Sequence, residues 1–141
     1  MKRHKILNSI SGVDKVFGKL CWEAENCYKN ENYFAAISCL FIATEQIIKY
    51  SLSENDGNFH QSLLKAKKNK VINSNLFMAL EDLRNLRNRL FHESQYTPIT
   101  EFIFDGILYP PYEDETRKFI YERFSGVIFD LVNKIILNKI G

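Results

Sequence analysis

The chain has 141 residues and a net charge of +2, with 45% apolar and 26% charged residues. This length is enough for one domain with its own hydrophobic core, and the composition excludes an intrinsically disordered chain. The net charge is too small to indicate a nucleic-acid-binding protein by itself. Polar residues interrupt the apolar stretches well before ~18 positions, so we expect one soluble domain over residues 1–141 and no membrane span.

The N-terminus and the cysteines indicate the compartment. The basic residues 1–5 are not followed by the apolar core of a secretion signal. Cys21, Cys27 and Cys39 form an odd set without CxxC spacing, and all three lie in apolar, helix-like segments. Free thiols in a reducing cytosol are therefore favoured over a disulfide framework or a zinc site. We expect a cytoplasmic protein that uses no metal and no cofactor.

Apolar residues spaced three and four positions apart predict helices along most of the chain. The first covers residues 13–28, and a second, strongly patterned helix follows over residues 33–52. After a polar loop, residues 59–68 form a short amphipathic helix with lysines on its outer side. Asn73 or Ser74 then caps a long helix that ends at His92.

The last part of the chain begins with an irregular insertion over residues 96–112, whose prolines and glycine prevent a continuous helix. Within it, residues 102–104 form either a brief strand or an apolar loop. A final helix over residues 113–140 is apolar on more than one side and needs two partners. The bundle can supply one partner and a second subunit the other. We expect an all-α fold, a bundle of four long helices with one short helix inserted.

The most informative segment is the end of the helix that stops at His92. At 100° per residue, five leucines share one apolar stripe: Leu76, Leu80, Leu83, Leu86 and Leu90. Arg87 lies near the middle of this stripe, where an unpaired buried guanidinium is costly. Asn88 and His92 are four residues apart and are neighbours on the adjoining face. A permanent cation, an amide and an imidazole at one helix end suit phosphodiester chemistry.

The segment Arg87-Asn88-Arg89-Leu90-Phe91-His92 resembles the Arg-(four residues)-His signature of HEPN domains, including the polar residue directly after the arginine. Residues 33–49 and the short helix over 59–68 are similar to the elements that precede the motif helix in that family. The resemblance implies a HEPN-like bundle and metal-independent cleavage of RNA by its own 2′-OH, which leaves 2′,3′-cyclic phosphate ends. It also implies a homodimer with two motifs across one cleft, and a role as a toxin or defence-system component.

The resemblance gives three residues a catalytic role. His92 transfers a proton at neutral pH. Arg87 clamps phosphate oxygens through a guanidinium that stays charged. Asn88 holds the imidazole or a phosphate oxygen by hydrogen bonding.

Five more residues are candidates for supporting roles, each with a purely structural alternative. Glu45 is either the carboxylate partner of the motif arginine or a solvent-edge residue. Arg84 and Arg89 either extend the positive field for an RNA backbone or belong to a solvated helix face. The same two interpretations apply to Lys67 and Lys68.

Other interpretations of the motif stay open. His92 can be a helix-capping residue, and Arg87 can be part of a structural ion pair. The chain is then a HEPN-like module that dimerises or binds nucleotide or RNA without cleaving it, or a helical protein-interaction subunit. Some HEPN toxins carry a tyrosine two residues after the histidine, which a partner antitoxin modifies. Ser94 stands at that position here, which argues against neutralisation of this kind.

Overall fold

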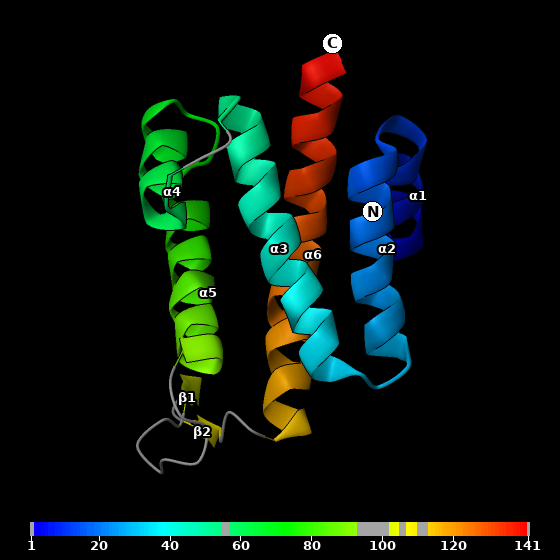
Figure 1. Cartoon of the computed structure of the whole chain (residues 1–141), viewed down its shortest axis with the longest axis vertical. Coiled ribbons are helices and arrows are strands. Elements are labelled where there is room, and N and C mark those ends of the chain that lie inside the picture. The colour runs from blue at the N-terminus through cyan, green and yellow to red at the C-terminus, as the bar shows by residue number, and fades with distance from the viewer. Residues whose placement is uncertain (1, 55–56, 93–101, 105–106, 110–112, 141) are drawn as a thin grey trace.

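The computed structural model describes residues 2–54, 57–92, 102–104, 107–109 and 113–140 (Figure 1), and the side chains of His92 and of the two short strands lie outside this description. Helices dominate the described part, which confirms the predicted all-α class. They are α1 (Arg3–Val13), α2 (Lys15–Lys29), α3 (Tyr33–Leu52), α4 (Phe59–Lys68), α5 (Ser74–His92) and α6 (Asp114–Ile140).

The N-terminal helix α1 is missing from the sequence-based prediction, which counted five helices and began the first at residue 13. Its buried side is narrow, with Ile6, Leu7 and Ile10 pointing inward. The basic residues before them and the serines and glycine after them obscure this pattern. A break at Asp14 separates α1 from α2. The Asp14 side chain accepts a hydrogen bond from the Phe17 backbone N–H at 2.9 Å. This contact caps the start of α2.

Helix α6 packs against α3 and α1, while α2 packs against both α1 and α3 (Figure 1). Its buried residues lie on two adjoining sides of the helix: Ile120, Tyr121, Phe124, Ile128, Phe129, Leu131, Val132, Ile135 and Ile136. Helix α1 covers much of the side that α3 leaves open. The pattern that we had assigned to contact with a second subunit is therefore explained within one chain, because the missed helix α1 supplies the second partner.

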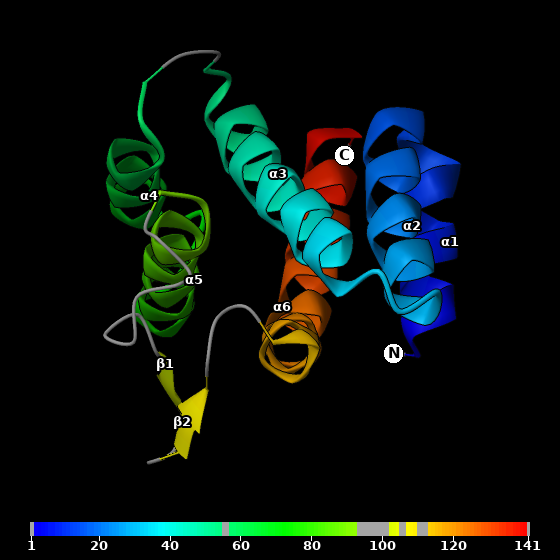
Figure 2. The same ribbon diagram turned by 60° about the horizontal axis from the view of Figure 1, so that its bottom comes forward.

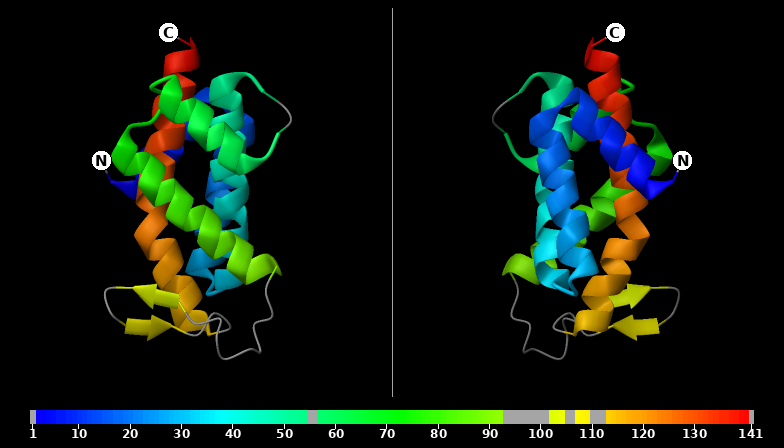
Figure 3. Two further views of the ribbon diagram at one scale, coloured as in Figure 1. Left: turned by 90° about the vertical axis from the view of Figure 1, so that its left-hand side faces the viewer. Right: turned by 90° about the vertical axis from the view of Figure 1, so that its right-hand side faces the viewer.

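Helices α4 and α5 pack on each other and form a separate layer beside α3 (Figures 2 and 3). The layer is attached mainly through α4, and the contact between α5 and α3 is smaller. Two short strands follow, β1 (Phe102–Phe104) and β2 (Ile107–Tyr109), which pair antiparallel with Phe102 opposite Tyr109. Of the two predicted alternatives, a strand or an apolar loop, residues 102–104 form the strand. Most of the predicted insertion lies outside the described residues.

Helix α3 is the one helix in the described ranges that is long and apolar enough to cross a membrane by length and composition. The sequence alone had predicted no membrane span. In the fold, α3 contacts α2, α4 and α6. A central position of this kind explains its apolar composition, because a helix surrounded by other helices is apolar on most sides.

A buried polar cluster joins α1, α2 and α6. The hydroxyl of Tyr121 donates to Oε1 of Glu25 at 2.7 Å, and Nη1 of Arg3 reaches the same oxygen at 3.3 Å and Oγ of Ser125 at 2.8 Å. Glu25 is only 4% exposed and Tyr121 is fully buried. Burial, followed by the hydrogen bond to Glu25, raises the pKa of Tyr121 far above its ordinary value. The phenol therefore stays protonated and acts as a donor.

Gly18 is required where α2 crosses α1. A Cβ atom at this position would lie 2.6 Å from the Cα of Ser11, which is backbone that cannot move aside. We expect Gly18→Ala to lower the free energy of unfolding by about 1–3 kcal/mol, because overpacking forces the two helices apart. Urea denaturation monitored by circular dichroism measures the change.

Gly126→Ala is the matched control, because Gly126 lies on an exposed side of α6 with open space at the Cβ position. It should raise the stability by about 0.5–1 kcal/mol through helix propensity alone. Equal effects of the two substitutions would show that α1 and α2 do not meet at this point.

Candidate functional site

Arg87 reaches from α5 to α3 and forms an ion pair with Glu45. Its Nη1 donates to Oε2 of Glu45 at 3.0 Å, and Nζ of Lys49 lies 3.0 Å from the other oxygen of the same carboxylate. The side chains of Arg87 and Glu45 are 22% and 28% exposed. The expected contact is therefore present, and the guanidinium on the leucine stripe has an acidic partner. Two cations share one anion, so the group keeps one excess positive charge.

Arg87 also borders an open pocket of about 410 Å³ between α3, α4 and α5. The pocket is mainly apolar and aromatic apart from the ion pair, with walls formed by Phe41, Ile42, Glu45, Asn58, Phe59, Arg87 and Phe91. The guanidinium carbon lies 5.5 Å from the centre of the Phe59 ring, which is a cation–π distance. A molecule that enters this pocket meets both the guanidinium and apolar surface.

The other two motif residues are placed less fully. The Asn88 amide oxygen lies 3.5 Å from Nη2 of Arg87, a long and weak hydrogen bond. His92 is the last residue of α5, and its side chain lies outside the described residues. The structure thus brings Arg87, Asn88 and Glu45 together and fixes the helix end that carries His92.

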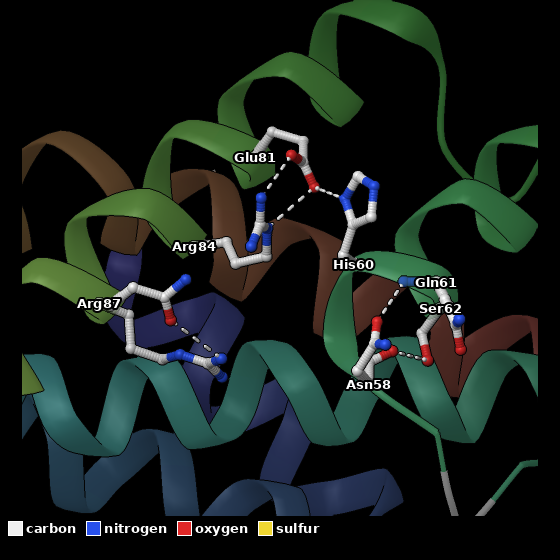
Figure 4. Close-up of polar contacts among 8 residues, drawn as sticks. Asn58, His60, Gln61, Ser62, Glu81, Arg84 and Arg87 are labelled. Carbon is white, nitrogen blue, oxygen red and sulfur yellow. Dashed lines mark hydrogen bonds and ion pairs between the residues drawn. The ribbon is translucent and has the colours of Figure 1, made fainter. Parts of the chain in front are cut away.

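Arg84 belongs to a different group of contacts, which the sequence analysis did not identify. Its Nε and Nη2 donate to the two carboxylate oxygens of Glu81 at 3.2 and 3.1 Å, and Nδ1 of His60 lies 2.9 Å from the same carboxylate (Figure 4). The spacing of Glu81 and Arg84 by three residues on one helix is the signal that predicts such a pair. His60 comes from α4 and has no nearby sequence signal.

The environment of Glu81 changes its pKa. Partial burial raises the pKa of this carboxyl, but the hydrogen bonds and charges of Arg84 and His60 outweigh that effect, so the pKa lies below its usual range. The group of three therefore fixes α4 against α5 through an ionised carboxylate.

The remaining candidates for RNA contact do not surround the motif arginine. Lys67 and Lys68 are exposed at the end of α4, and Nζ of Lys67 lies 4.8 Å from the centre of the Phe77 ring. Because Phe77 and Arg87 are ten residues apart on α5, these lysines lie about 15 Å along the helix from the motif. Arg89 is half-buried and has an interaction of its own.

Thiols and metal ligands contribute no second site among the described residues. Cys21 is buried, and burial raises the pKa of its thiol to about 12, so it is not a reactive nucleophile. In the same part of the chain, no three histidine, cysteine, aspartate or glutamate side chains gather as metal ligands.

Comparisons with protein-family models, with curated proteins and with solved structures find no match to the chain.

The lowered pKa of Glu81 predicts a pH-dependent contribution to stability. A carboxyl whose pKa is lower in the folded state stabilises the fold above the ordinary glutamate range, and this contribution is lost as the pH falls through the lowered value. We therefore expect the stability difference between wild type and Glu81→Gln to be largest near neutral pH and to shrink on acidification. Urea titrations between neutral and acidic pH measure it. Glu31→Gln, at an exposed position, is the control, and an equal pH dependence in both variants would contradict the assignment.

Proposed function

We propose that the chain is a HEPN-like, metal-independent endoribonuclease whose site lies at the C-terminal end of α5. The observation that carries the proposal is the position of Arg87, which borders an open pocket next to the helix end that bears His92. A guanidinium in the wall of an open pocket is accessible to a phosphate group. The motif resemblance supplies the reaction class, and a cytoplasmic toxin or defence role belongs to the same proposal.

The chemistry needs few protein groups, because RNA carries its own nucleophile. The 2′-OH attacks the neighbouring phosphorus, the 5′-oxygen leaves, and the products are a 2′,3′-cyclic phosphate and a 5′-OH. The His92 imidazole transfers a proton in this step. Arg87 stabilises the charge that develops on the phosphate oxygens. Asn88 orients the imidazole, since positions 88 and 92 face the same way on a regular helix.

Helix geometry also favours a homodimer in this proposal. Residues 87 and 92 are about 140° apart around a regular helix, so one chain does not place both side chains on the same side of a phosphate. Two copies related by a two-fold axis bring each arginine close to the partner's histidine. The exposed apolar side chains of Ile42 and Phe91 beside Arg87 suit such a contact.

Cleavage of a fluorescent RNA oligonucleotide in EDTA tests the proposal. We expect His92→Ala and Arg87→Ala to lower the rate at least about 100-fold, because each removes a group that acts in the transition state. His4→Ala, at an exposed histidine of α1, should retain the wild-type rate. The matching 2′-O-methyl RNA should remain intact. Equal rates for wild type and His92→Ala, or no cleavage by either, would exclude the enzyme.

The ion pair itself favours a second candidate, an RNA- or nucleotide-binding module that does not cleave. Glu45 occupies part of the Arg87 guanidinium and reduces its attraction for phosphate. In this case RNA binding depends on salt and on Arg87, but no cyclic phosphate forms.

Glu45→Gln measures how strongly the carboxylate restrains Arg87. Removing its charge should strengthen RNA binding several-fold, because the guanidinium no longer has a competing anion. The same change should lower the stability by about 1 kcal/mol through the lost ion pair. Glu31→Gln removes a carboxylate at an exposed position away from both pockets and should leave RNA affinity unchanged. Fluorescence anisotropy gives the affinities, and unchanged binding in Glu45→Gln would place RNA away from Arg87.

A further inference from the structure

A second pocket, of about 360 Å³, lies where the C-terminal ends of three helices meet. Its walls come from the last turn of α3, from the turn after α4 and from the last turns of α6: Ser51, Asn69, Lys70, Val71, Lys134, Ile135, Asn138 and Lys139. Figures 1 and 3 both show the end of α6 beside the end of α3, at the end of the molecule opposite the β1–β2 hairpin. The pocket is therefore separate from the one that Arg87 borders.

The lining of this pocket carries three positive charges and no negative one. Within the described residues, no carboxylate pairs with Lys70, Lys134 or Lys139. Nζ of Lys139 is held by neutral groups, at 3.0 Å from Oγ of Ser53 and 5.2 Å from the centre of the Tyr50 ring. Glu54, which follows Ser53 in the chain, pairs with Lys65, and Lys65 does not line the pocket.

Helix ends do not balance this charge. Each helix C-terminus carries a partial charge of about −0.5, so three ends together supply at most about −1.5 against the three lysines. The three lysines are exposed to solvent, and about half of their positive charge has no partner in the described part of the protein. A multivalent anion that enters the pocket therefore meets a net positive wall.

We infer that this pocket binds a phosphate ester, with the lysines around the phosphate and the remaining wall around the organic group. Lysine is a common phosphate ligand, and three ammonium groups on two separate segments can surround a tetrahedral anion. The volume exceeds that of a bare phosphate and falls within the range of small-molecule sites. The side chains of Val71 and Ile135 provide an apolar wall, and the Asn69 and Asn138 amides provide hydrogen-bonding groups.

This inference goes beyond the proposed ribonuclease activity and does not depend on it. Both a free nucleotide and the terminal phosphate of an RNA strand have the required chemistry. The exposed Lys67 and Lys68 continue the positive surface from the turn after α4, so an RNA strand has further contacts available there.

Isothermal titration calorimetry at low salt tests the inference with four probes: pyrophosphate, adenosine, ADP and a 5′-phosphorylated hexaribonucleotide. We expect saturable binding of the phosphate-bearing probes and none of adenosine. The double variant Lys70→Gln/Lys134→Gln should weaken that binding at least tenfold, and Lys134→Arg should retain it because the charge is kept. Tighter binding of ADP assigns the site to a free nucleotide, and tighter binding of the hexaribonucleotide assigns it to an RNA end.

The matched control is Lys5→Gln/Lys118→Gln, which removes two exposed positive charges outside the pocket. It should change the affinity less than twofold. If both double variants weakened the binding of the phosphate-bearing probes equally, the binding would result from general electrostatic attraction. This result would contradict a specific site in the pocket. Binding of adenosine as tight as that of ADP, or no saturable binding of any phosphate probe, would overturn it as well. RNA cleavage by the His92 site is measured separately, so either proposal can fail alone.

Discussion

The fold depends on covering α6 on two sides. This helix carries buried residues on two adjoining sides and exposed residues along the remaining side, so two neighbouring helices must cover it. Helix α3 covers one of these sides and α1 the other, and α2 packs against both α1 and α3. The polar cluster of Arg3, Glu25, Tyr121 and Ser125 lies within the second interface, where its satisfied hydrogen bonds fix the relative positions of the three helices. The remaining pair, α4 and α5, is added to the outside of this arrangement.

Both candidate sites lie at the junction between that outer pair and the central helices. Arg87 of α5 meets Glu45 of α3 on one side of the junction, and the lysine-lined pocket lies between the turn after α4 and the end of α6 on the other. Because α5 itself makes few contacts with α3, the two helices are joined by this ion pair and by the edge contacts of the Phe91 ring with Phe34 and Phe41. The group of His60, Glu81 and Arg84 connects α4 only to α5, so it keeps the outer pair together without fastening it to the bundle.

The sequence predicted most of the helices because their apolar spacing is regular. One of its two interpretations of Glu45 made this residue the partner of Arg87, because an arginine on a buried stripe needs an acid, and the structure shows this contact. It missed α1, whose inward side has only Ile6, Leu7 and Ile10, so one side of α6 was left open to a second subunit. The contact of His60 with Glu81 spans 21 residues, and Lys70 lies 64 and 69 residues before the two lysines that share its pocket, Lys134 and Lys139. Such contacts have no local pattern, so only the tertiary arrangement reveals them.

The role of α1 as the outer cover of α6 has a practical consequence for work on this protein. Removing the first thirteen residues to simplify expression would expose an apolar strip along the longest helix of the chain. Two shortened molecules would then associate through this exposed apolar surface and form an artificial dimer. Self-association measured on the shortened protein would therefore result from the removal of α1. It would not be evidence for the homodimer that a catalytic cleft between two copies requires.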